Sequence, residues 1–120
     1  MLMNIEKYTQ NAQQVVLDCQ NIATSSGHQM VDGEHIHLAL LKQRDGLIPK
    51  LLKSMNIDPE LVAADVQTEL NKLPKVSGEA DNMYGTRRFN KIFLDAEEIA
   101  EQFKDEYVSV EHLYLALFAE

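Results

Sequence analysis

The chain has 120 residues, and its eleven lysines and arginines stand against nineteen aspartates and glutamates, a formal net charge of −8. This length suits one domain with a buried core, and the acidic balance disfavours nucleic-acid binding because backbone phosphates repel an acidic surface. No apolar run approaches the ~20 residues of a membrane span, residues 1–9 show no secretory signal, and the single Cys19 excludes an internal disulfide, so we expect a cytoplasmic domain without membrane or nucleic-acid partners.

The first half of the chain begins with a helix, a short link and a second helix. Apolar residues recur at three- and four-residue steps from Ala12 to Ala23, and Gly27 is suited to the left-handed cap that ends such a helix. Met30 and Val31 are expected to be extended, and Asp32 to cap a second helix whose leucines face the core. This half is therefore predicted to be helical from its first elements.

Two further helices are predicted before a linker. Residues 47–55 form a short apolar segment with Pro49 in its first turn, and Asp58-Pro59 is a cap followed by proline at the first helical position. The helix that follows is expected to end before Pro74. Residues 75–85 have no periodicity and are rich in turn-forming residues, so an exposed linker is expected there.

The second half repeats the first at a fixed offset. When each residue from 9 to 41 is aligned with the residue 77 positions later, eleven of the 33 pairs are identical. The identical residues of the first copy are Thr9, Leu17, Asp18, Ile22, Ala23, Val31, Glu34, His35, Leu38, Ala39 and Leu40. A repeat of this length indicates one supersecondary unit used twice. We expect an all-α fold, a pseudo-twofold duplicated helical bundle around a shared core.

The two repeats are predicted to differ in length. Repeat 1 spans 5–73, a linker covers 74–85, and repeat 2 covers 86–120 without counterparts of the third and fourth helices. We expect a fragment of a longer chain; the alternative is a natural 120-residue protein with a shortened second half. The second repeat should expose apolar side chains that the first repeat covers, and we expect this apolar patch to be buried by self-association of the chain.

The repeated elements resemble a known family. The segment 33–41, Gly-Glu-His-Ile-His-Leu-Ala-Leu-Leu, returns as Val-Glu-His-Leu-Tyr-Leu-Ala-Leu at 110–117, and Tyr8-Thr9, Leu17-Asp18 and Gly27-His28 complete the pattern. This pattern resembles the Clp N-terminal domain of the AAA+ unfoldases. The stretch 73–78 and the departures at Asp32-Gly33 and Ser109-Val110 are more similar to the ClpB type than to ClpC or ClpA.

The resemblance implies that this part of the chain binds other proteins and does not catalyse a reaction. It implies a non-catalytic domain that captures unfolded or aggregated polypeptides for the AAA+ modules of the same full-length chain, a hexameric ATPase. The alternative is an adaptor-docking domain of a ClpC- or ClpA-type protease subunit, with adaptor proteins as partners. The sequence has no phosphate-binding Gly-x-x-x-x-Gly-Lys-Ser/Thr motif, so we expect neither an enzyme nor a bound cofactor here.

Three candidate residues for polypeptide binding follow from the resemblance: Thr9, Asp105 and Glu111. We expect them beside a groove at the seam between the units, with acidic rims and an apolar floor suited to apolar, partly basic segments. The simpler alternative is local, since Thr9 can be a helix cap and Glu111 can stabilise the first turn of a helix.

The histidines and the cysteine are predicted to be structural. His35 and His37 are two residues apart and diverge on a helix, whereas a two-histidine metal site needs a spacing of three or four. We expect His35 and His112 to hydrogen-bond locally near their helix starts, and no metal site. Cys19 aligns with Ala96, which indicates a buried position for the thiol rather than a nucleophile.

Overall fold

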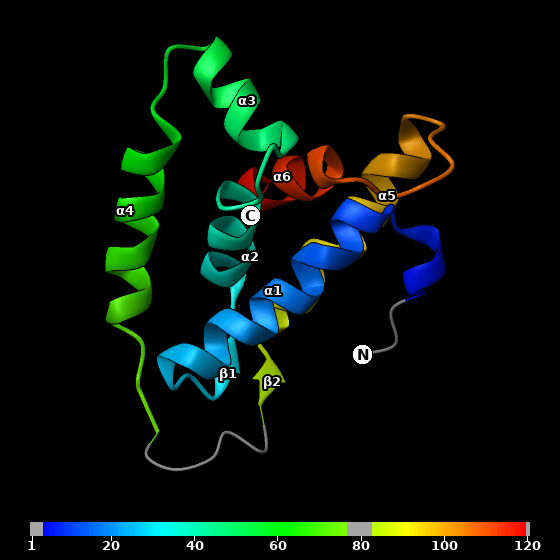
Figure 1. The fold of residues 1–120 in the computed structure, drawn as a ribbon. Coiled ribbons are helices and arrows are strands. Elements are labelled where there is room, and N and C mark those ends of the chain that lie inside the picture. Colours follow the sequence, from blue (N-terminus) through cyan, green and yellow to red (C-terminus); the bar gives the residue numbers. More distant parts are fainter. Residues whose placement is uncertain (1–3, 77–82, 120) are drawn as a thin grey trace.

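A computed structural model describes residues 4–76 and 83–119, and its regular structure there is almost entirely helical (Figure 1). The helices are α1 (Gln10–Ser26), α2 (Gly33–Leu41), α3 (Leu47–Ser54), α4 (Pro59–Asn71), α5 (Arg87–Gln102) and α6 (Val110–Phe118), preceded by the 3-10 turn η1 (Ile5–Lys7). Two-residue strands β1 (Met30–Val31) and β2 (Tyr84–Gly85) form a short parallel ladder. The predicted all-α class is confirmed.

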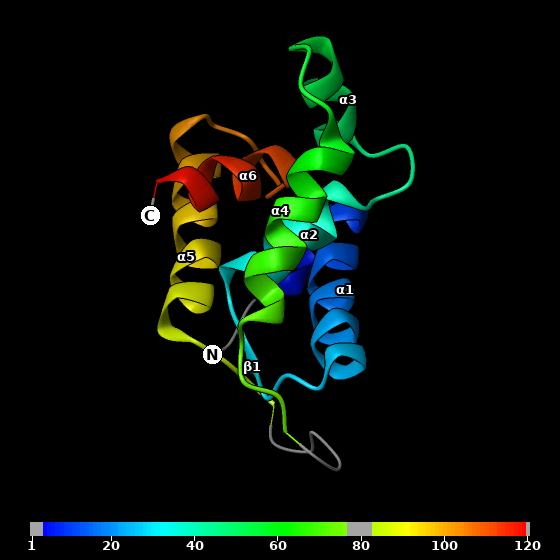
Figure 2. The same ribbon diagram turned by 90° about the vertical axis from the view of Figure 1, so that its left-hand side faces the viewer.

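The duplication is visible in the helix bounds. Both α5 and α6 begin 77 residues after their counterparts α1 and α2, and α6 also ends 77 residues after α2. Figure 2 shows α5 and α1 on opposite sides of the molecule with α2 and α6 between them. This is the pseudo-twofold arrangement expected from the sequence, and 5–73 and 86–120 remain our proposed extents for the two repeats.

Backbone pairing between the units follows the same symmetry. The link of the first unit pairs through Val31 with Gly85, just before α5, and the link of the second unit pairs through Val108 with Tyr8, just before α1. The N–H of Thr9 donates to the Val108 carbonyl at 2.9 Å, and the N–H of Thr86 donates to the Val31 carbonyl at 3.0 Å. Each unit therefore supplies the strand partner that the extended link of the other requires.

The helix ends are set by the residues the sequence singled out. Gly27 ends α1 with φ of 74°, in the left-handed region, and Asp58 caps α4 with Pro59 in its first turn. The equivalent of Gly27 in the second unit is Lys104, which adopts φ of 60° although it is not glycine. The second unit thus repeats the backbone conformation of the first with a less suitable residue.

The core is shared between the two units. Its largest fully buried side chains include Phe93 and Ile92 from α5, Ile36 and Leu40 from α2, and Leu113 from α6. Cys19 is also fully buried, as predicted from its alignment with Ala96, which is buried as well.

The expected linker is more structured at its ends than the sequence indicated. The N–H of Val76 donates to the Gly27 carbonyl at 2.8 Å, and Tyr84 and Gly85 form strand β2. Lys75 and Tyr84 are exposed, as expected for a linker, but both ends are held by backbone hydrogen bonds to the first link that the sequence did not indicate. Residues 77–82 lie outside the described residues.

Within residues 4–76 and 83–119, the second helix is covered by a following helix in the first unit and not in the second. Helices α3 and α4 follow α2, and α4 packs along it (Figures 1 and 2). Leu38 and Leu41 of α2 are 2% and 6% exposed, whereas their equivalents Leu115 and Phe118 on α6 are 48% and 67% exposed. The predicted exposure of apolar side chains on the second unit is confirmed.

Candidate functional site

The three candidate residues lie around the strand pair that joins the second unit's link to the first unit. The Val108 carbonyl accepts from the Thr9 N–H, and Asp105 and Glu111 lie three residues to either side of Val108. Asp105 and Glu111 are exposed, and Thr9 is partly buried. The fold therefore brings residues from both ends of the sequence to one region of the surface.

Thr9 performs the capping role that the sequence offered as the alternative. Its hydroxyl oxygen accepts from the Ala12 N–H at 3.2 Å, in the first turn of α1. Thr86 makes the equivalent bond with the Phe89 N–H at 3.1 Å.

Asp105 is fixed by a histidine of the same unit. The N–H of Ser109 donates to His112 Nδ1 at 2.9 Å, so the neutral ring carries its proton on Nε2. Nε2 then donates to the Asp105 carboxylate at 2.8 Å, which leaves the aspartate side chain 51% exposed. Asp105 can therefore face solvent while one of its oxygens is held in place.

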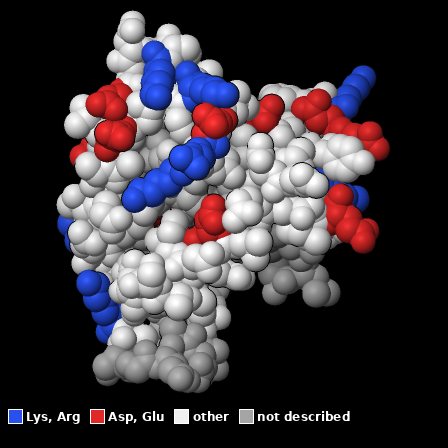
Figure 3. Space-filling view, in the orientation of Figure 1, with Lys and Arg blue, Asp and Glu red and all other residues white. Residues whose placement is uncertain are grey.

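Asp105 also lines an acidic hollow at this end of the molecule. The hollow measures about 440 Å³ and is lined by Lys7, Glu97, Ala100, Glu101, Asp105, Glu106 and Val108. Figure 3 shows acidic side chains gathered over this side. Exposed Phe103 and Tyr107 flank Asp105 in the sequence, so carboxylates and aromatic rings occur together on this link.

A buried tyrosine anchors the wall of this hollow. The Tyr8 hydroxyl donates to the Glu97 carboxylate, and the Tyr8 ring lies beside Phe93. Burial, and then the hydrogen bond and negative charge of Glu97, raise the pKa of Tyr8 far above its usual value. The phenol therefore stays protonated and acts as a hydrogen-bond donor.

The groove with the predicted chemistry lies elsewhere, at the seam between α4 and α6. It measures about 390 Å³ and is lined by Gly33, Glu34, His37, Val62, Asp65, Val66, Glu69, Arg88, Leu117 and Phe118. The floor is apolar and the rim is acidic, but Thr9, Asp105 and Glu111 do not line it. Asp65 and Glu69 were not among the residues predicted for binding, although their spacing of four residues on a helix indicates a shared face.

Arg88, which lines this groove, forms ion pairs across the seam. Arg88 Nη1 lies 3.2 Å from Glu34 Oε1 and 3.7 Å from Asp32 Oδ1. The position equivalent to Arg88 in the first unit is Asn11, and the described part of the chain gives Glu111 no ion pair. Glu111 is therefore the less neutralised of the two equivalent glutamates.

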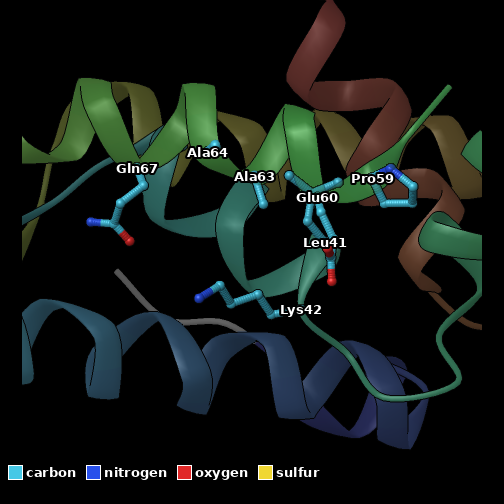
Figure 4. Close-up of a pocket in the computed structure, with 7 residues that line it drawn as sticks. All are labelled: Leu41, Lys42, Pro59, Glu60, Ala63, Ala64 and Gln67. Carbon is cyan, nitrogen blue, oxygen red and sulfur yellow. The ribbon is translucent and has the colours of Figure 1, made fainter.

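A third, mostly apolar space lies between α4, α2 and α1 (Figure 4). It measures about 580 Å³ and is lined by Leu41, Lys42, Pro59, Glu60, Ala63, Ala64 and Gln67. Lys42 and Gln67 extend between α4 and α1, and the α4 wall is formed by small side chains. Its residues include no histidine or cysteine that could serve as a base or nucleophile.

The histidines hydrogen-bond as predicted. His35 Nδ1 accepts from the Asp32 N–H at 2.9 Å, in the same geometry as His112 and Ser109. His37 points away from His35, and its Nε2 lies 3.1 Å from the hydroxyl of Tyr114, its own equivalent in the second unit. Two equivalent residues in contact lie beside the axis that relates the units.

Three further observations concern metal binding, the reactivity of Cys19 and membrane insertion. In those residues there is no group of three or more histidine, cysteine, aspartate or glutamate side chains that could hold a metal ion. Burial, with a smaller effect from Asp18, raises the pKa of the Cys19 thiol well above its usual range, so the thiolate needed for nucleophilic attack does not form near neutral pH. None of the helices in the described ranges is long and apolar enough to cross a membrane.

Comparison with known proteins identifies the family. The chain is 45% identical to the chaperone protein ClpB of Clostridium tetani over 118 residues, and 43% identical to that of Nitratidesulfovibrio vulgaris over 121. These alignments cover 96% and 98% of the chain, which spans 14% of each relative's length. The fold matches the Hsp104 N-terminal domain from Candida albicans with a TM-score of 0.84 at 22% identity, covering 92% of this chain and 73% of that one. Residues 7–120 match the Clp repeat (R) N-terminal domain, and the chain belongs to this family.

Proposed function

We propose that this chain captures exposed segments of unfolded or aggregated polypeptides for a ClpB-type ATPase of which it is the N-terminal domain. The ATP-hydrolysing AAA+ modules, assembled as a hexamer, would lie in the rest of such a protein. The chain itself has neither a phosphate-binding loop nor a catalytic set of residues in the sites described above.

The observation that carries the proposal is the uncovered link of the second unit. Phe103 and Tyr107 are exposed beside the carboxylates of Asp105 and Glu106. Aromatic rings supply apolar contact area, and carboxylates attract basic side chains. A segment of unfolded chain that mixes apolar and basic residues therefore suits this surface.

Thr9 and Glu111 extend the same surface across the strand pair. Glu111 stands at the start of α6 without an ion pair among the described residues, and the backbone of Thr9 is bonded to the link at Val108. Contacts of this kind favour weak and broad binding, because exposed charges interact modestly and no deep polar pocket selects one sequence. Such binding suits a receptor for many substrates.

The test is binding of a labelled, unfolded peptide of alternating leucine and arginine to the double variant Asp105→Asn, Glu111→Gln. We expect roughly a tenfold weaker affinity at low salt, from the loss of two charges contributing about 0.2–1 kcal/mol each. Asparagine at 105 keeps an oxygen for His112, so the fold should be retained, and circular dichroism checks this.

The matched control is Asp65→Asn, Glu69→Gln, which removes the same charge from the seam groove. We expect its affinity to stay close to that of the unchanged chain. Equal affinity of all three proteins would contradict the proposed function, and a loss confined to the control would move the site to the seam.

The second candidate is docking of a folded adaptor protein, and the seam groove favours it. Its Arg88–Glu34 ion pair and apolar floor form a more fixed surface than the exposed link. A single partner binding with one-to-one stoichiometry, sensitive to Asp65→Asn, Glu69→Gln, would support this alternative.

A further inference from the structure

His28 and His35 form a buried pair apart from the residues proposed for polypeptide capture. Both side chains are buried, His28 just after the cap of α1 and His35 in the first turn of α2. Nδ1 of His28 lies 3.0 Å from Nε2 of His35, and the two rings are nearly perpendicular. The pair joins the end of one helix to the beginning of the next.

The direction of each hydrogen bond in this pair follows from the backbone. The Asp32 N–H donates to His35 Nδ1, so neutral His35 must carry its proton on Nε2 and donate it to His28 Nδ1. Neutral His28 must then carry its proton on Nε2, a buried atom for which the described ranges show no hydrogen bond of ordinary length. The bond from the Asp32 N–H to His35 and the bond from His35 to His28 are both made only when both rings are neutral.

A further proton disrupts the network at either ring. A charged His28 has an N–H on Nδ1, so it no longer accepts from His35, and two N–H groups face each other. A charged His35 has an N–H on Nδ1, so it no longer accepts from the Asp32 backbone. In each case one hydrogen bond is replaced by a donor–donor contact in a buried site.

The groups around the pair shift the pKa values of the two histidines in opposite directions, and burial, which lowers both values, has the largest effect. Burial and then the nearby Lys75 lower the pKa of His28, while the Leu70 carbonyl acts in the opposite direction. Burial and then His28 lower the pKa of His35 against the backbone and carboxylate of Asp32 and the carboxylate of Glu34. Both carboxylates also face Arg88 from α5, which reduces their effect.

The second unit has a carboxylate where the first has His28. Position 28 corresponds to position 105, and Asp105 accepts from His112 Nε2 at 2.8 Å. A carboxylate accepts a hydrogen bond from a neutral or a charged imidazole, so protonation of His112 leaves its contact with Asp105 in place and disturbs only its bond with the Ser109 N–H. The repeat therefore supplies an internal control for the histidine pair.

The pair lies under the backbone that closes the first unit. The N–H of His28 donates to the Ala23 carbonyl at 2.8 Å, and His28 forms an isolated antiparallel bridge with Lys75. The N–H of Val76 donates to the Gly27 carbonyl next to it. Loss of the ring pair would loosen the attachment of the segment that follows α4.

We propose that the His28–His35 pair is an acid-sensitive latch, which holds the end of α1 and the Lys75–Val76 segment together at neutral pH and opens in mild acid. The Asp105–His112 pair stays closed under the same conditions.

The sign of the pH dependence follows from linkage. The folded chain binds fewer protons at these rings than the unfolded chain, whose histidines titrate near pH 6.5. The stabilisation is therefore complete above about pH 6.5 and is lost as the pH falls below it, with up to a tenfold change in the opening equilibrium per pH unit for each proton taken up.

The test is amide hydrogen exchange of the 120-residue chain between pH 7.5 and 5.5, measured by NMR and corrected for intrinsic exchange. The two amides to compare are those of His28 and Asp105, which bond to equivalent carbonyls of Ala23 and Ala100 at 2.8 and 2.9 Å. We expect the protection factor at His28 to fall roughly tenfold from pH 6.5 to 5.5, while that at Asp105 changes little.

Two variants separate the latch from general acid sensitivity. His28→Asn keeps a side-chain oxygen that can accept from His35 but does not titrate, so the fall in protection at position 28 should disappear. Asp105→His places a second histidine pair in the second unit, so a fall should appear at position 105. The proposal is overturned if the two amides respond alike in the unchanged chain, or if Asp105→His leaves position 105 insensitive to pH; the second variant decides alone if His28→Asn does not fold.

Discussion

The two links of the molecule have nearly the same backbone and very different surroundings. In the first unit, β1 is paired with β2 and the Lys75–Val76 segment covers the turn after α1. In the second, the described residues pair through the isolated bridge between Tyr8 and Val108, and Phe103 and Tyr107 stay exposed. Equivalent local signals thus build equivalent local structure, whereas the segments packed over that structure decide how much of each link is exposed to solvent.

The same contrast applies to the second helix of each unit. Helix α4 covers the apolar face of α2, and the corresponding face of α6 is open. Equivalent side chains consequently make unequal contributions to stability, which equivalent substitutions can measure.

The largest expected difference is between Leu38→Ala and Leu115→Ala. Leu38 is buried under α4, so its truncation should lower the free energy of unfolding by about 2–4 kcal/mol through lost burial and a cavity. Leu115 is half exposed and should cost less than about 1 kcal/mol. Urea denaturation measures both, and equal costs would mean that α6 is covered in solution.

A smaller difference is expected between the two capping threonines. Thr86 accepts from the Phe89 N–H and also donates to the Asp32 carboxylate at 2.9 Å, a bond to a charged group. We expect Thr86→Ala to lower the free energy of unfolding by about 2 kcal/mol and Thr9→Ala by about 1 kcal/mol. Thermal unfolding measures the loss of stability in each variant, and a larger loss for Thr9→Ala than for Thr86→Ala would contradict this prediction.

The two left-handed helix ends should respond in opposite directions. Gly27→Ala places a side chain at φ of 74° and should destabilise the chain by about 1 kcal/mol, although the added carbon would meet no close neighbour. Lys104→Gly relieves the same strain at φ of 60° and should stabilise the chain by less than about 1 kcal/mol. Chemical denaturation of both variants tests this pair, and destabilisation by Lys104→Gly would contradict it.

The open face of α6 should cause weak self-association. Two variants of that face, Leu115→Ser and Phe118→Ser, should shift sedimentation at high protein concentration towards the monomer, because the exposed apolar area is reduced. Their effect on the free energy of unfolding should be the smallest of those considered, since both side chains are largely solvent-exposed in the monomer. A monomer at all concentrations before substitution would refute the expectation.

Much of the fold could be predicted because its signals are local. Asp58 and Pro59 start α4, and Gly27 ends α1, through conformational preferences that act within one helical turn. Repeat alignment extended these assignments to α5 and α6 and indicated the shared core. Strand β2 escaped prediction because Tyr84 and Gly85 become extended only by pairing with β1, more than fifty residues earlier.

The candidate site was predicted less completely. Asp105 was singled out, but its bond to His112 and the acidic hollow around it depend on how α5 and α6 pack. The seam groove with the expected acidic rim is lined by Asp65 and Glu69 instead, because α4 packs on α2 and lines the same groove as the end of α6.

By itself the sequence determined the duplication, the helix limits and the histidines that close the two capping turns, since each depends on residues a few positions apart or on a fixed offset. Only the tertiary structure decided which copy of each element is covered and where carboxylates lie beside apolar side chains on the surface. It also decided that His28 and Asp105, at equivalent positions, contact the equivalent histidines His35 and His112. The physical reason is that burial and electrostatic environment are properties of neighbours in space, and two related local sequences with equivalent helices received different neighbours.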